Sequence, residues 1–201
     1  MKIKIIPVGM LQANCYLVYD EEAKEAMVID PGAPEEKILE EINALDLVVK
    51  YLVNTHGHYD HVEGNAYVHK ATGALLYIHE EDSAMMTEVA AVKADGFLRD
   101  GQILEVGKLR WTVLHTPGHT KGGICLVGQG VCFSGDTLFA GTIGRTDFPD
   151  GSLEEMMRSL ETKLAALPDE TTVYPGHGPQ TTIGQEKRLN PYLSRFTGWA
   201  E

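Results

Sequence analysis

The sequence predicts an α/β (α+β) fold arranged as a four-layer αββα sandwich, with two sheets packed face to face and helices outside them. Short apolar runs with strand character and amphipathic helical segments recur in two comparable halves of the chain. Periodicity alone also permits other α/β arrangements. With 201 residues, 43% of them hydrophobic, the chain can bury one sizeable core. We therefore expect residues 1–201 to form a single domain.

The first half is expected to begin with an antiparallel sheet. Three strand-like runs, 2–8, 14–19 and 26–30, are separated by turn signals. Pro34 with Glu35 and Glu36 is a favourable helix start, and apolar residues continue at helical spacing to Leu45. Further along, the pattern predicts a buried strand over 48–53, a helix over 62–72, a strand over 74–78 and a helical segment over 80–94.

The second half is expected to return to strands and to end in helix. Strands are predicted over 109–114, 123–127, 131–133 and 172–174. A helix is predicted over 152–166, and its start carries the capping-box pair Ser152 and Glu155. A short helix near 184–189 completes the pattern.

Charge and composition restrict the partners. The 17 basic and 29 acidic residues give a formal net charge of −12, which disfavours nucleic acid and anionic lipid surfaces. No apolar run approaches the roughly 20 residues that cross a bilayer, so we expect no membrane association and a cytoplasmic location. Cys15, Cys125 and Cys132 lie in strand-like runs and are expected to be buried thiols. We expect a monomer or a small homo-oligomer.

The strongest chemical signal directly follows the strand predicted over 48–53. His56, His58, Asp60 and His61 lie within six residues there. In an extended loop, residues two apart project to the same side, so His56 and His58 can meet one metal while the other two reach beyond it. Imidazole and carboxylate together suit zinc or iron and leave the identity of the metal open.

Three further loops have the same organisation, in which a strand end is followed by small residues and one candidate ligand. They present His119, Asp136 and His177, each beside a glycine. Glycine permits tight turns and close approach of the backbone to an ion. The simplest geometry places all three loops and the 56–61 segment on a common rim.

The order HxHxDH, a later His, a later Asp and a last His resembles the metallo-β-lactamase superfamily, and the match spans Asn14 to His177. Residues 14–16, 28–32 and the Gly-Arg-Thr-Asp-Phe run at 144–148 are most similar to short relatives of hydroxyacylglutathione hydrolase (glyoxalase II). The resemblance implies the metallo-β-lactamase fold and a small-molecule substrate. It also implies two divalent metal ions per chain, for which we expect zinc, with iron or manganese as alternatives.

The resemblance further implies a role for each ligand. His56, His58 and His119 would bind the first ion, and Asp60, His61 and His177 the second, with Asp136 bridging both. A hydroxide between the ions, oriented by Asp60, would attack a thioester of the S-lactoylglutathione type. The thiolate leaves readily because thiols have a pKa near 8.5.

Several interpretations stay open at this stage. Arg145 is a candidate contact for a substrate carboxylate, or it pairs with Asp147 and only holds the loop. Asp30 is expected to organise a loop as a hydrogen-bond acceptor, and His115 is a candidate outer-sphere residue. Larger glyoxalase II enzymes carry a helical domain with glutathione contacts where only 24 residues follow His177 here. The alternative reactions are hydrolysis of a different thioester or of another small ester or lactone, and iron-dependent persulfide dioxygenation, whose enzymes share a loop that resembles Gly144 to Phe148.

Overall fold

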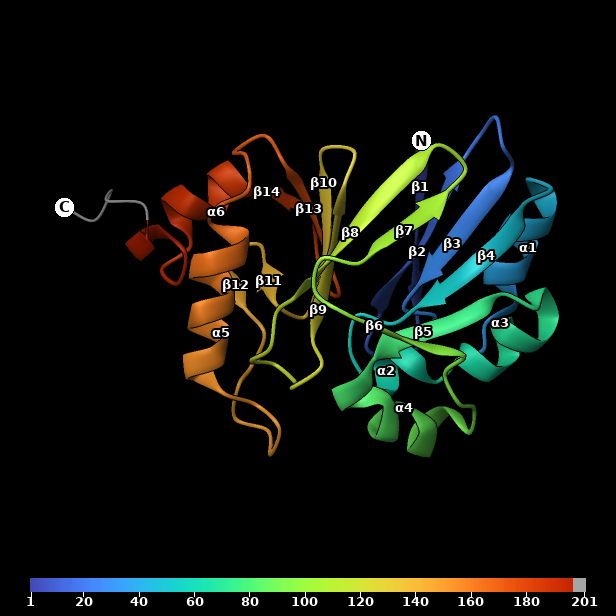
Figure 1. Cartoon of the computed structure of the whole chain (residues 1–201), viewed down its shortest axis with the longest axis horizontal. Coiled ribbons are helices and arrows are strands. Elements are labelled where there is room, and N and C mark those ends of the chain that lie inside the picture. Colours follow the sequence, from blue (N-terminus) through green and yellow to red (C-terminus); the bar gives the residue numbers. More distant parts are fainter. Residues whose placement is uncertain (197–201) are drawn as a thin grey trace.

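Two six-stranded sheets pack face to face in the computed structural model, which describes residues 1–196. Helices α1 and α3 cover the outer face of one sheet, and α5 and α6 lie outside the other (Figure 1). The arrangement confirms the predicted four-layer αββα sandwich.

The first sheet has the strand order β1-β2-β3-β4-β5-β6. As predicted, it begins antiparallel, from β1 through β3, and the later strands then pair in parallel. Its strands are β1 Lys2–Val8, β2 Ala13–Asp20, β3 Glu25–Ile29, β4 Val48–Val53, β5 Leu75–His79 and β6 Gly96–Leu98.

The second sheet has the order β14-β13-β10-β9-β8-β7 and is antiparallel except for the pair of β10 with β13. Its strands are β7 Ile103–Val106, β8 Leu109–His115, β9 Ile124–Gly128, β10 Val131–Gly135, β13 Thr172–Pro175 and β14 Thr181–Thr182. A separate hairpin pairs β11 Leu138–Phe139 with β12 Thr142–Ile143.

The helices follow the sequence pattern with shifted ends. They are α1 Glu36–Ala44, α2 Tyr59–Val62, α3 Asn65–Thr72, η1 Glu80–Asp82, α4 Ser83–Ala90, α5 Leu153–Ser159, the π-helical η2 Leu160–Leu164, α6 Ile183–Leu189 and η3 Ser194–Phe196. None of the helices within residues 1–196 combines the length and hydropathy of a bilayer-spanning segment.

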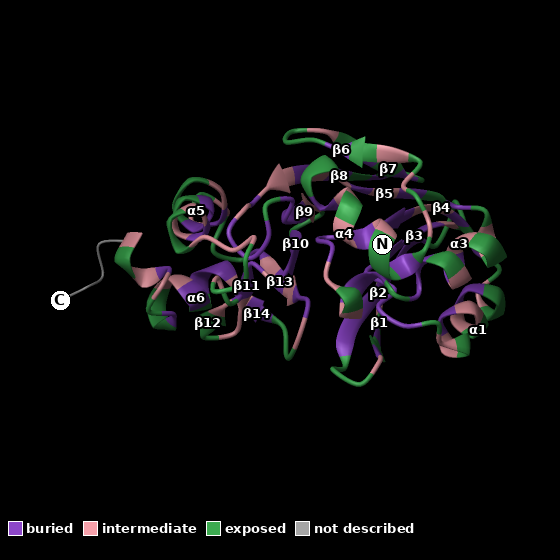
Figure 2. Ribbon diagram, turned by 90° about the horizontal axis from the view of Figure 1, so that it is seen from below, coloured by how far each residue is buried: buried purple, intermediate pink, exposed green. Residues whose placement is uncertain are grey.

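Three apolar clusters hold the four layers together. One lies between the first sheet and its helices and includes Ile38 and Val68, and another fills the space between the sheets around Trp111 and Phe133. A third joins the second sheet to its helices through Leu160. Figure 2 shows buried residues running through the strands of both sheets. The three cysteines are buried free thiols, as predicted.

Two predicted helices differ from the structure at their ends. The helix expected over 62–72 starts at Asn65, because Val62 ends the short helix α2 and residues 63 and 64 form a turn between the two helices. The helix expected over 80–94 ends at Ala90, since Ala91 adopts a left-handed conformation with φ 52°.

The start of α5 is tied to a loop that carries a candidate ligand. The Ser152 hydroxyl accepts a hydrogen bond from the Glu155 amide at 3.2 Å, as the capping-box prediction requires. In a full capping box the amide of Ser152 would donate to the Glu155 side chain. Here it donates instead to the Gly118 carbonyl at 2.8 Å, which ties the start of α5 to the loop before His119.

Candidate metal centre

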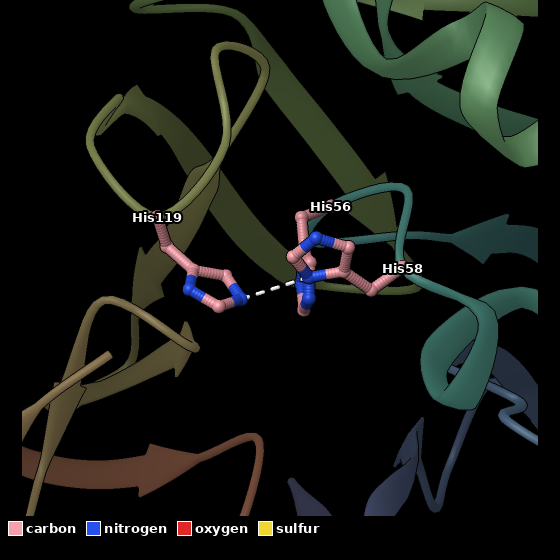
Figure 3. Close-up of side chains that lie close together, drawn as sticks. All are labelled: His56, His58 and His119. Carbon is pink, nitrogen blue, oxygen red and sulfur yellow. Dashed lines mark hydrogen bonds between the residues drawn. The ribbon is translucent and has the colours of Figure 1, made fainter. Parts of the chain in front are cut away.

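All seven predicted ligands meet where strands of both sheets end. His56 and His58 follow β4, and Asp60 and His61 lie in α2 directly after them. The loops after β8, β10 and β13 carry the other three, which are His119, Asp136 and His177. Figure 3 shows His119 approaching from one side and His56 and His58 from the other.

A first group consists of three imidazoles. The ligand atoms of His56, His58 and His119 all lie within 4.8 Å of one another. His58 Nδ1 is 2.9 Å from His119 Nε2. Two ring nitrogens this close are stabilised when a proton or a metal ion lies between their lone pairs.

A second group combines two imidazoles with a carboxylate. The ligand atoms of Asp60, His61 and His177 again lie within 4.8 Å of one another. His177 Nε2 is 3.1 Å from Asp60 Oδ2 and 3.2 Å from His61 Nε2. This group offers one hard oxygen and two nitrogens, a donor set that suits zinc, iron or manganese.

Asp136 lies between the two groups. Its Oδ1 is 3.5 Å from His61 Nε2, and its Oδ2 is 3.5 Å from His119 Nε2. The two carboxylate oxygens therefore face different groups, which is the placement that a bridging ligand needs.

Hydrogen bonds on the far side of each ring orient three of the histidines. His119 Nδ1 donates to the Arg145 carbonyl at 2.7 Å, and His61 Nδ1 donates to Asp30 at 3.0 Å. The Thr55 hydroxyl donates to Asp30 at 2.6 Å, so its oxygen accepts from His56 Nδ1 at 3.1 Å. Each arrangement leaves Nε2 with its lone pair toward the centre, as metal-binding histidines require.

Asp30 supports both groups. Besides His61 and the Thr55 hydroxyl, it accepts a hydrogen bond from the Thr55 amide at 2.7 Å. Its backbone has φ 50°, a left-handed conformation that is unfavourable for a residue with a side chain. Asp30 is thus the loop-organising acceptor that the sequence predicted.

The ionisation of these groups favours a cation. Burial, followed by the neighbouring His119 ring, lowers the pKa of His58 to about 4, and burial also lowers the pKa of His56. Burial opposes charge on His61 as well, yet the carboxylates of Asp136 and Asp30 raise its pKa to about 9. A negative field that holds a proton on His61 also attracts a divalent ion.

The donor set therefore fits a pair of divalent metal ions. Among the described residues, His56 Nε2 and Asp136 Oδ1 are buried without a hydrogen-bond partner. Buried polar atoms without partners are costly, and both of these atoms face the centre of the cluster. Metal coordination would satisfy both.

A cavity of about 870 Å³ adjoins the cluster and is lined by five of the seven predicted ligands. This volume is in the range of small-molecule sites. Sequence reasoning missed its apolar wall, because isolated apolar residues in loops carry no periodic signal. The wall consists of Leu11, Met85, Phe139, Phe148 and Pro149.

Arg145 also lines the cavity, and it is already paired. Its Nε and Nη2 donate to the two carboxylate oxygens of Asp147 at 2.7 Å, and its guanidinium lies 4.0 Å from the Phe148 ring centroid. Nη1 is not used in this bidentate pair. The outer-sphere candidate His115 stacks on His79 with ring centroids 4.1 Å apart, and its Nε2 hydrogen-bonds to the Lys121 carbonyl. Neither of these partners is a predicted metal ligand.

The chain belongs to the metallo-β-lactamase superfamily, whose family model matches residues 8–177. Among curated relatives, hydroxyacylglutathione hydrolase GloC of Haemophilus influenzae is 41% identical over 96% of this chain and 99% of its own.

Three solved structures have the same fold. BLEG-1 B3 metallo-beta-lactamase has a TM-score of 0.88 at 35% identity, covering 96% of this chain and 100% of its own. ETHE1 from Myxococcus xanthus has a TM-score of 0.86 at 30% identity, and the match covers 100% of this chain and 92% of the ETHE1 chain. TTHA1623, solved in a di-iron-bound form, has a TM-score of 0.81 at 34% identity, and the match covers 94% of this chain and 100% of the TTHA1623 chain. The family membership and the ligand cluster together indicate a metal-dependent hydrolase.

Proposed function

We propose that this chain hydrolyses a small thioester of the hydroxyacylglutathione type with two divalent metal ions. The observation that carries the proposal is the pair of ligand groups, three imidazoles in one and Asp60, His61 and His177 in the other, joined by Asp136 beside a substrate-sized cavity. The similarity to hydroxyacylglutathione hydrolase GloC supports the choice of a thioester.

The chain's own groups have defined tasks in this reaction. Metal ions held by the two ligand groups would supply an activated water and polarise the carbonyl of the substrate. Asp60 lines the cavity, and its hydrogen bond with His177 helps to keep its pKa low although burial opposes this. Its carboxylate therefore stays ionised, accepts a hydrogen bond from the attacking water and orients it toward the carbonyl. The thiolate leaves without a dedicated acid because thiols have a pKa near 8.5.

The cavity wall favours a substrate with an apolar part. Leu11, Met85 and Phe148 face the cavity, whereas the guanidinium of Arg145 is largely engaged by Asp147. We propose that Arg145 contacts the substrate through Nη1 while Asp147 fixes its orientation. The bidentate pair with Asp147 leaves Nη1 to donate to one polar or anionic group of the substrate.

Release of thiol from S-lactoylglutathione and from the matching N-acetylcysteamine thioester tests both parts of the proposal. The metal-loaded protein is expected to hydrolyse at least one of them, and the ratio of the two kcat/KM values reports how much the glutamyl and glycyl parts of glutathione contribute. Protein that contains two ions and releases thiol from neither thioester would contradict thioester hydrolysis. Small esters and lactones, whose hydrolysis releases acid and no thiol, would then be tested by proton release.

Iron-dependent persulfide dioxygenation is the second candidate. The observations that favour it are the position of Arg145 and Phe148, from the Gly-Arg-Thr-Asp-Phe run, in the cavity and the similarity to ETHE1. Oxygen uptake with glutathione persulfide, measured beside metal content, separates the two reactions. Iron-loaded protein that takes up oxygen rapidly with glutathione persulfide, forms sulfite and releases no thiol from either thioester would favour the dioxygenase.

A further inference from the structure

We propose that Asp82 is a positioning residue for the first metal site, because its carboxylate holds together the two loops that carry His56, His58 and His119. Asp82 ends the short helix η1 after β5 and is only 1% exposed. It belongs to neither ligand group and no sequence motif marks it. The inference rests on the proposed two-metal site.

The Asp82 carboxylate accepts three hydrogen bonds, and all three donors belong to the ligand loops. Oδ2 accepts from the Gly57 amide at 2.9 Å and from the Thr120 hydroxyl at 2.6 Å. Oδ1 accepts from the Gly122 amide at 2.7 Å. Gly57 lies between His56 and His58, and Thr120 directly follows His119. One buried side chain therefore fixes the separation of the loops.

These loops come from different sheets. The loop of His56 and His58 follows β4 of the first sheet, and the loop of His119 follows β8 of the second. The 2.9 Å separation of His58 Nδ1 and His119 Nε2 depends on how closely the sheets approach at this point. The bonds to Asp82 provide a direct polar link across the gap.

The two loops pack closely against Asp82. A Cβ at Gly57 would lie 2.9 Å from the Asp82 carbonyl oxygen and 3.2 Å from its Cβ. A Cβ at Gly122 would lie 2.6 Å from both Cγ and Oδ1 of Asp82. Bare backbone at both positions lets the amides reach the carboxylate. The hydrogen bonds that Asp82 accepts in the described part of the chain do not involve Asp60, His61 or His177, so its influence is specific to the first site.

The variant Asp82→Asn tests this role, because it keeps the shape but replaces one acceptor oxygen with an NH2 group that faces a donor. Zinc is removed from the loaded protein with increasing chelator, and the affinities of the two sites are fitted separately. Outer-sphere changes weaken metal binding by roughly 10- to 100-fold. We expect that loss at the first site and a change below about threefold at the second, with a shifted visible spectrum of the first-site Co²⁺ form.

Glu186→Gln is the matched control. Glu186 is also 1% exposed and accepts from three neutral donors, Gly141, Thr181 and Asn190, away from the first-site loops. It is expected to lower stability to a similar degree while both metal affinities stay at the wild-type values. If Asp82→Asn does not fold, Thr120→Val removes one of the three bonds, and Thr120→Ser, which retains the hydroxyl, is expected to restore first-site affinity.

Two results would overturn the role of Asp82. One is an equal loss of metal affinity at both sites, and the other is a first-site affinity within about threefold of wild type in both Asp82→Asn and Thr120→Val. Failure of the wild-type chain to bind two ions would instead contradict the proposed metal centre. The two failures are therefore distinguishable.

Discussion

Gly176, in the loop that presents His177, offers a sharp test of how tightly the centre is built. A Cβ at this position would lie 2.1 Å from Asp136 Oδ1 and 2.8 Å from His61 Cε1. Ordinary nonbonded contacts are roughly 3.5 Å, so Gly176→Ala has to move the Asp136 carboxylate by about 1.4 Å. A misplacement of about 1 Å in a catalytic site can reduce the rate by about 100-fold. We expect Gly176→Ala to lose about that factor in kcat/KM and to bind both ions more weakly.

The assay is thiol release by the metal-loaded variant, with metal affinity measured by chelator competition. Gly178→Ala in the same loop is the control. A Cβ at this position meets no atom within 4 Å, but the alanine has to adopt the left-handed φ of 73°. It is expected to cost about 1–2 kcal/mol of unfolding free energy and to leave metal binding unchanged. Wild-type kcat/KM and metal affinity in Gly176→Ala would refute the geometry of the bridging group.

Three further predictions follow from the described contacts. Asp136→Ala removes an oxygen from each ligand group, so we expect the loss of at least one ion by metal analysis and a fall in kcat/KM of several orders of magnitude; near-normal turnover would contradict the shared ligand. Ser152→Ala removes the cap bond to the Glu155 amide and should lower the free energy of unfolding by about 1 kcal/mol in urea titration, whereas an unchanged midpoint would show that the cap contributes nothing. Chelation should lower the melting temperature, because each ion at 100 times its dissociation constant stabilises the folded state by about 2.7 kcal/mol, and equal melting curves with and without chelator would argue against bound metal.

The sequence predicts most of the site because most of its information is local. His56, His58, Asp60 and His61 form one short motif after a buried strand, and their types alone indicate metal binding. The other three ligands converge because β8, β10 and β13 run in the same direction, so their carboxyl ends lie at one edge of the second sheet. The sheet layers likewise follow from the alternation of apolar segments, whereas the expectation of a single domain stays a prediction.

The residues that sequence reasoning misses act through contacts between distant segments. Asp82 lies 38 positions from Thr120 and 25 from Gly57, and nothing in the local pattern places these residues together. The two-residue strands β11, β12 and β14 are too short to show alternation. Helix ends such as Ala90 depend on left-handed residues and close backbone contacts that only the packed structure defines.

X-ray anomalous scattering from a crystal of the metal-loaded chain would locate the bound ions. We expect two peaks about 3.5–4 Å apart, one beside His56, His58 and His119 and one beside Asp60, His61 and His177, with Asp136 in contact with both. A single peak, or metal bound away from these seven side chains, would contradict the proposed two-metal site.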